Sequence, residues 1–159
     1  MSKFAILTNI NYFNYFLDNI DGVCYNNYME IKHINSDIHI TGQSDFALKH
    51  IFDCGQCFRF NASEDGSYTG TAFGKTVKIS CEDGDIILHD TSEDDFRNIW
   101  YNYLDLGSDY SAIKTALTAD GDMVMKEAVR YGSGIRILRQ DLWETIISFI
   151  ISASNNIPR

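Results

Sequence analysis

The residues best suited to chemistry stand close together in one short segment. Cys54 and Cys57 enclose a Gly-Gln pair and form the motif C-x-x-C, which can carry thiol–disulfide exchange when the first cysteine begins a helix after a strand. Here an alternating, strand-like stretch follows the motif, and the single proline, Pro158, is too remote to face the pair. We therefore expect Cys57 to pack as a small apolar residue. Without further information, Gly55 and Gln56 are turn residues between a helix and a strand.

Other chemically capable residues do not form a recognisable site. A zinc site needs four ligands at fixed spacing, whereas Cys24, Cys81 and the four histidines are scattered along the chain. The seven carboxylates between residues 82 and 95 are more simply explained by a solvated hairpin and an acidic helix start than by a metal site. No Ser-His-Asp arrangement or phosphate-cradling glycine loop is visible. The sequence predicts no metal and no cofactor.

Length and charge limit the kinds of protein to which these residues can belong. The chain has 159 residues, a formal charge of −9 and 45% hydrophobic residues, which suits a single domain with a sizeable core. The acidic balance argues against a nucleic-acid binder held by bulk charge, although a local DNA-reading surface remains possible. The sequence offers neither an apolar stretch long enough for a membrane span nor a signal peptide, so we expect a soluble cytoplasmic protein.

Alternating apolar and polar residues predict a series of short strands. The first alternation runs over 31–40, and Ser44 and Asp45 then begin a short helical pattern. A meander follows, and its short turns favour antiparallel pairing. Its expected strands cover 57–60, 67–73, 75–81 and 85–89. The predicted fold class is α+β, an antiparallel meander with flanking helices, and we expect Phe58, Phe60, Phe73 and Trp100 in the core.

The period changes after Ser92, where a helix cap precedes three acidic residues. Shorter helical patterns cover 110–117 and 123–131. The last helix begins at Asp141, with Glu144 in the position of a capping box, and is apolar on nearly every face. Such a helix needs burial on all sides, yet Arg159 ends the sequence soon after it. We interpret the chain as truncated and expect helical sequence to follow Arg159.

Four segments together resemble one family. They are FDCGQCFRF (52–60), SYTGTAFG (67–74), GIRILRQD (134–141) and FIISASNNIPR (149–159). In order and spacing they resemble the 8-oxoguanine DNA glycosylases, from about Tyr28 to Arg159. The resemblance implies a TATA-binding-protein-like antiparallel sheet domain over 28–135, the start of a helix-hairpin-helix domain over 136–159, and an N-terminal extension over 1–27.

The resemblance also implies a chemistry. Members of the family flip 8-oxoguanine out of duplex DNA, cut its glycosidic bond with a lysine that forms a Schiff base with the sugar, and can then nick the strand. An aspartate assists. Both catalytic residues would lie beyond Arg159, so this chain should hold no catalytic residue and should be inactive by itself.

Binding residues carry over only at matched positions. The resemblance makes Gly55 the residue whose carbonyl reads the flipped base. Ser154, Asn155 and Asn156 would enter the DNA, and Arg159 would read the cytosine left behind. The position that fills the gap of the flipped base is an asparagine in the family and Ser154 here, so either Ser154 or Asn155 takes this role.

Two other functions stay open at this point. The chain could belong to a glycosylase for another damaged purine, such as an alkylated one, or it could be a non-catalytic interaction module that acts through its apolar last helix. The expected partner is double-stranded DNA containing 8-oxoguanine, at the bacterial nucleoid in the cytoplasm, with no membrane. We also expect the truncated chain to self-associate through residues 142–151.

Overall fold

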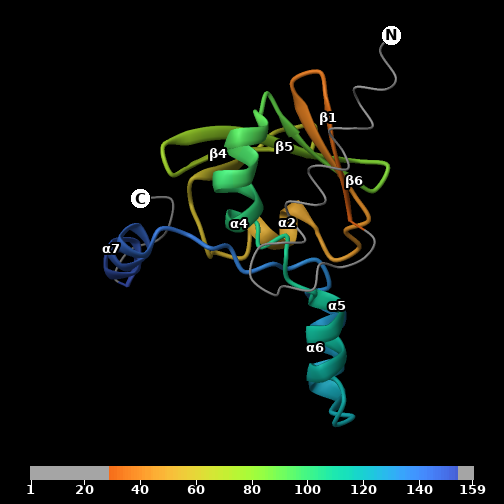
Figure 1. The fold of residues 1–159 in the computed structure, drawn as a ribbon. Coiled ribbons are helices and arrows are strands. Elements are labelled where there is room, and N and C mark those ends of the chain that lie inside the picture. The colour runs from red at the N-terminus through yellow and green to blue at the C-terminus, as the bar shows by residue number, and fades with distance from the viewer. Residues whose placement is uncertain (1–28, 154–159) are drawn as a thin grey trace.

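The computed structural model describes residues 29–153 and is built on one six-stranded antiparallel sheet (Figure 1). The strand order is β1-β2-β6-β5-β4-β3, and every neighbouring pair is antiparallel. The strands are β1 (Glu30–Ile34), β2 (Asp37–Thr41), β3 (Phe60–Ala62), β4 (Tyr68–Ala72), β5 (Lys75–Glu82) and β6 (Asp85–His89). The predicted α+β class and the antiparallel meander are confirmed. The predicted N-terminal extension, 1–27, lies outside the described residues.

Helices cover one face of the sheet, and the hydrophobic core lies between this face and the helices. Alternate residues of the central strands, such as Ile38, Ile79 and Leu88, are buried there. A continuous helical segment packs on this face and consists of α3 (Glu93–Asp95), the π-helical η1 (Phe96–Trp100) and α4 (Tyr101–Tyr103). Its start is capped as predicted, because the Ser92 hydroxyl accepts the Asp95 N–H at 3.1 Å. Trp100 is fully enclosed, as expected for a core residue.

Two elements begin later than the sequence predicts. The helix expected to open at Ser44 and Asp45 is α2 (Leu48–Phe52). The reason is tertiary, since the Asp45 carboxylate binds Ser111 and Lys114, and the Ala47 N–H donates to the Gly134 carbonyl at 3.0 Å instead of entering a helical ladder. The strand expected over 57–60 is β3, which starts only at Phe60.

The predicted aromatic core is half right. Phe60 and Trp100 are buried, whereas Phe58 and Phe73 are 49% and 50% exposed. Phe58 precedes β3 and lies outside the ladder, and Phe73 occupies the tight turn between β4 and β5 with a positive φ of 50°. Neither position places its side chain fully against the inner face of the sheet.

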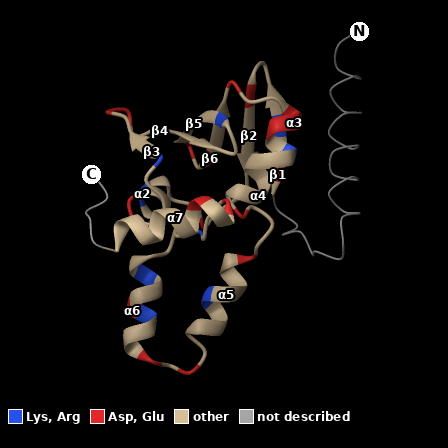
Figure 2. Ribbon diagram, turned by 90° about the vertical axis from the view of Figure 1, so that its left-hand side faces the viewer, with Lys and Arg blue, Asp and Glu red and all other residues tan. Residues whose placement is uncertain are grey.

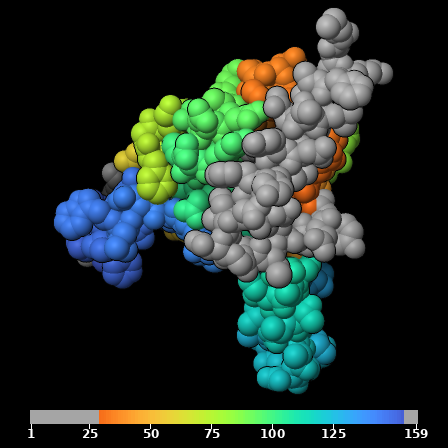
Figure 3. Space-filling view, viewed as in Figure 1, coloured from red at the N-terminus to blue at the C-terminus, as the bar shows by residue number. Residues whose placement is uncertain are grey.

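Three helices lie outside the sheet body. They are α5 (Tyr110–Leu117), α6 (Met123–Tyr131) and α7 (Leu142–Ser152), close to their predicted ranges. The first two form a hairpin that extends away from the sheet, and α7 projects from another side (Figures 1 and 3). None of the three contributes a buried residue. None of the helices in the described part of the chain is long and apolar enough to span a membrane.

Candidate base-recognition site

The loop after α2 presents Gly55 to solvent. Gly55 is exposed and has a φ of 85°, a conformation that glycine adopts without steric cost. No hydrogen bond among residues 29–153 uses its carbonyl. The residues on both sides of it are held at one point, because the Cys54 Sγ and the Gln56 Nε2 both donate to the Ile51 carbonyl, at 3.3 and 2.8 Å. The loop therefore offers a fixed and unused backbone acceptor.

Gln56 also ties this loop to a segment eighty residues further along the chain. Its Nε2 donates to the Arg136 carbonyl at 2.8 Å, and its Oε1 accepts the Leu138 N–H at 2.9 Å. The Gln56 main-chain carbonyl accepts from the Gln140 side chain at 2.6 Å. We call residues 134–141, which contain no regular secondary structure and lead directly into α7, the strap. Gln56 binds the strap at three places.

Two further backbone N–H groups of the strap are bound by residues of the helical segments. The Ile137 N–H donates to the Tyr110 hydroxyl at 2.8 Å, and the Arg139 N–H donates to the Tyr103 carbonyl at 3.0 Å. At its start, Gly134 must be a glycine, because a Cβ there would overlap Ala47. These bonds give an irregular segment the backbone partners that a helix or strand would otherwise supply.

Arg136 is the buried centre of this region, with 1% of its surface exposed. Its guanidinium donates to the Asp45 and Asp105 carbonyls at 3.0 and 2.6 Å and to the Gln43 Oε1 at 2.5 Å. It also lies over the Tyr110 ring, 4.5 Å from the centroid. Burial lowers the pKa of Arg136, because the charged form loses its hydration. One side chain thus joins the chain before α2, the end of the helical layer and the strap.

A shallow groove separates the sheet from α7. Its lining includes Cys57, Phe58, Phe73, Tyr103, Gln140 and Glu144. An ion pair crosses it, with the Arg59 Nε 2.7 Å from the Glu144 Oε1. Cys57 is buried in the core, and burial, with a smaller contribution from Cys54, raises its pKa to about 12. The prediction that Cys57 packs as an apolar residue is confirmed, and a thiol so reluctant to ionise is a poor nucleophile.

Among the residues predicted to read the DNA or the flipped base, the structure describes Gly55 alone. Gly55 stands on the loop described above, and α7 leads from the strap towards the other predicted positions. Ser154, Asn155, Asn156 and Arg159 lie outside the described residues.

The acidic run from residue 82 to 95 has no buried carboxylate, which confirms the solvated interpretation. Figure 2 shows these carboxylates on α3 and at the strand ends.

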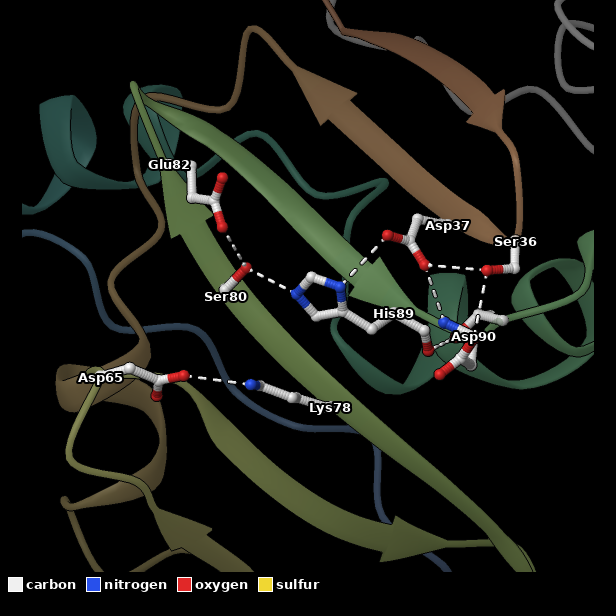
Figure 4. A network of polar contacts seen from close by, with 9 residues as sticks. Ser36, Asp37, Asp65, Lys78, Ser80, Glu82, His89 and Asp90 are labelled. Atoms are coloured by element: carbon white, nitrogen blue, oxygen red, sulfur yellow. Dashed lines mark hydrogen bonds and ion pairs between the residues drawn. The ribbon is translucent and has the colours of Figure 1, made fainter.

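One arrangement was missed by the sequence analysis, which found no Ser-His-Asp grouping. On the outer face of the sheet, the Ser80 Oγ lies 2.8 Å from the His89 Nε2, and the His89 Nδ1 lies 3.2 Å from the Asp37 Oδ2 (Figure 4). The Glu82 carboxylate also contacts the Ser80 hydroxyl, at 3.4 Å. That negative charge opposes the build-up of negative charge on an attacking oxygen, so the grouping serves as a polar tie between β2, β6 and β5.

The comparisons with known proteins agree with this architecture. Residues 39–146 match the model of the family described as "8-oxoguanine DNA glycosylase, N-terminal domain". The match covers well over half of the chain and includes strands β3 to β6, most of β2, the Gly55 loop and the strap. The chain belongs to this family.

Three relatives show the extent of the likeness. The curated "N-glycosylase/DNA lyase OGG1" of Arabidopsis thaliana is 29% identical over 128 residues, which cover 73% of this chain and 33% of that protein. A solved structure of MBOgg1 with a low-affinity DNA ligand is 47% identical, with a TM-score of 0.77, and covers 82% of this chain and 44% of that one. The 8-oxoguanine glycosylase/lyase of Clostridium acetobutylicum, in its apo-form, is 43% identical, with a TM-score of 0.74, and covers 83% and 45%. The chain spans less than half the length of each relative.

Proposed function

We propose that this chain is the N-terminal part of a DNA glycosylase and lyase that removes 8-oxoguanine from duplex DNA. Its own task is to form one wall of the pocket for the flipped base and part of the DNA-reading surface. Family membership supports this function, as does the likeness to a Clostridium acetobutylicum glycosylase/lyase solved with double-stranded DNA that carries cytosine opposite 8-oxoguanine. An enzyme with this substrate works where the DNA is, at the nucleoid in the cytoplasm if its source is bacterial.

The observation that carries the proposal is the unused carbonyl of Gly55. Guanine has a lone pair at the ring nitrogen where 8-oxoguanine has an N–H. A backbone acceptor held against this atom repels the first base and binds the second. Leaving one buried acceptor unpaired costs roughly 1–3 kcal/mol, so a single carbonyl can supply much of the discrimination. Glycine suits the position because no Cβ hinders close approach of the base.

The DNA-facing residues of the proposal follow α7. Ser154, Asn155 and Asn156 enter the DNA, where Ser154 or Asn155 fills the gap that the flipped base leaves. Arg159 reads the estranged cytosine. Arginine is well suited to this role because its guanidinium can form two hydrogen bonds with a base edge. In the full-length protein, Arg159→Ala should reduce the preference for cytosine over adenine opposite the lesion by about 1–3 kcal/mol. An unchanged ratio of cleavage rates would contradict the assignment.

Catalysis belongs to residues outside these 159. The nucleophilic lysine and the assisting aspartate are proposed to lie beyond Arg159, and this chain contributes substrate reading alone. The test is borohydride trapping with a duplex that contains 8-oxoguanine opposite cytosine. The full-length protein should form a covalent adduct and the 159-residue chain should form none. An adduct with the short chain would contradict this division of labour, and failure of the full-length protein to release 8-oxoguanine would overturn the function itself.

A further inference from the structure

Both neighbours of Gly55 are anchored, and they are anchored unequally. Cys54 holds the Ile51 carbonyl through a single sulfur contact at 3.3 Å. Gln56 holds the same carbonyl at 2.8 Å and adds three bonds to the strap, through its amide nitrogen, its amide oxygen and its main-chain carbonyl. The position of the Gly55 carbonyl therefore depends mainly on Gln56.

The strap is rigid at the places where Gln56 binds it. The side-chain amide of Gln56 binds the Arg136 carbonyl and the Leu138 N–H, and the Tyr110 hydroxyl binds the N–H of Ile137 between them. Arg136 is itself fixed by its buried guanidinium, and Leu138 is buried in the core. Gln56 is thus joined to the best-anchored part of the strap and not to a loose loop.

The strap leads without interruption into α7, whose cap is Asp141. Gln56 consequently stands between two places that the proposed function uses together, the Gly55 loop and the helix that precedes the DNA-entering residues. A glutamine amide can satisfy this position because it offers donors and an acceptor at once. Neither an apolar residue nor a carboxylate of the same shape could bind two carbonyls and one N–H.

We propose that Gln56 is a positioning residue for lesion recognition, which fixes the Gly55 carbonyl relative to the strap and α7. It acts through Gly55 and does not touch the base. This inference rests on the proposed function and extends it, since it identifies the side chain that sets the distance between the base-reading acceptor and the helix leading to the DNA.

The test is made on the full-length protein with the Gln56→Ala variant. Two affinities are measured: for a duplex with 8-oxoguanine opposite cytosine, and for the same duplex with a tetrahydrofuran abasic analogue at the lesion. The variant should lose about tenfold in affinity for the first duplex relative to the second, equivalent to about 1.4 kcal/mol. The abasic analogue has no base for Gly55 to read, so a general loss of structure would weaken both affinities together.

Two further variants make the test decisive. Val77→Ala destabilises the sheet at a buried position on β5, outside the loop and the strap, and it should leave the ratio of the two affinities unchanged. Gln140→Ala removes one of the bonds that hold Gln56, the one to its main-chain carbonyl. It should shift the ratio in the same direction by a smaller factor, and it carries the test if Gln56→Ala does not fold. If the wild-type enzyme releases 8-oxoguanine but neither variant shifts the ratio, the role of Gln56 is wrong and the proposed function stands. If the wild-type enzyme is inactive on 8-oxoguanine, the proposed function itself fails.

Discussion

Apolar residues are buried in the sheet region but exposed in the three C-terminal helices. In the sheet region, Ile40, Ile79 and Leu88 are completely enclosed by strands and by the helical layer. In α7, Leu142 and Trp143 are 74% and 71% exposed, although the helix is at least as apolar. Hydrophobicity alone therefore does not tell where a residue lies. The difference lies in the neighbouring residues: the sheet region buries its apolar side chains within residues 29–106 and against Leu138 of the strap, whereas α7 finds no such cover among residues 29–153.

The junction between the two regions combines one buried apolar residue, Leu138, with many polar contacts. The strap is held by the Gln56 amide, the Tyr110 hydroxyl and the Arg136 guanidinium. Directional hydrogen bonds fix position more narrowly than apolar contacts, which have no preferred orientation. Such a junction suits a segment that must place one region accurately against another. Each prediction below breaks one side of this comparison or the junction itself.

The largest effect is expected at the junction. Arg136→Ala leaves the Asp45 and Asp105 carbonyls and the Gln43 amide oxygen without their donor and opens a buried space. We expect the free energy of unfolding to fall by about 3–5 kcal/mol in urea denaturation. Arg130→Ala is the matched control, since Arg130 forms an exposed pair with Glu127 on α6, and because such pairs contribute little to stability, this variant should have a much smaller effect than Arg136→Ala. Equal losses for the two variants would contradict the central role of Arg136.

The second prediction compares the same substitution in the two regions. Ile79→Ala creates a cavity in an enclosed part of the sheet and should lower the free energy of unfolding by about 2–5 kcal/mol. Ile150→Ala in α7 removes a side chain that is 62% exposed and should change the free energy of unfolding by less than about 0.5 kcal/mol. Denaturant titration of both variants measures the difference. A large loss for Ile150→Ala would mean that α7 is buried in solution.

The third prediction concerns what an exposed apolar helix does in solution. Soluble monomers rarely expose contiguous apolar patches larger than a few hundred Å², so the 159-residue chain should self-associate through residues 142–151 as its concentration rises. Phe149→Lys places a charge on this surface and should shift the chain towards the monomer. Light scattering over a concentration series, with Ile113→Lys on α5 as the control, separates α7 from the other helices. If the wild-type chain stays monomeric over the whole concentration series, self-association through α7 is excluded.

Features set by neighbouring residues could be predicted from the sequence, whereas features set by contacts between distant segments could not. The strands and the caps at Ser92 and Asp141 follow from local patterns, because alternation and capping act over a few residues. The burial of Arg136 did not, since its partners come from three distant segments, and arginine is rarely buried in isolation. The Ser80, His89 and Asp37 grouping was missed for the same reason, because only the strand register brings these residues together. The Gly55 loop was recognised through its family motif and not through any local pattern.

The smallest effect is expected in the outer polar network of the sheet. The Asp90 backbone N–H donates to the Asp37 carboxylate at 2.9 Å, and this bond is the main cause of the lowered pKa of Asp37. Partial burial opposes the shift, whereas His89 and Ser36 lower the pKa further. A carboxyl whose pKa is lower in the folded state stabilises the fold above its unfolded pKa of about 3.9, and this contribution disappears as the pH falls through the folded value. Asp37→Asn should therefore cost less than about 1 kcal/mol near pH 6, and the difference from the wild type should shrink below pH 4. Asp120→Asn, which removes a carboxylate from the turn between α5 and α6, provides the control for the loss of one surface charge. A difference between wild type and Asp37→Asn that stays constant from pH 6 to pH 3 would show that the ionised form of Asp37 gives the sheet no additional stability.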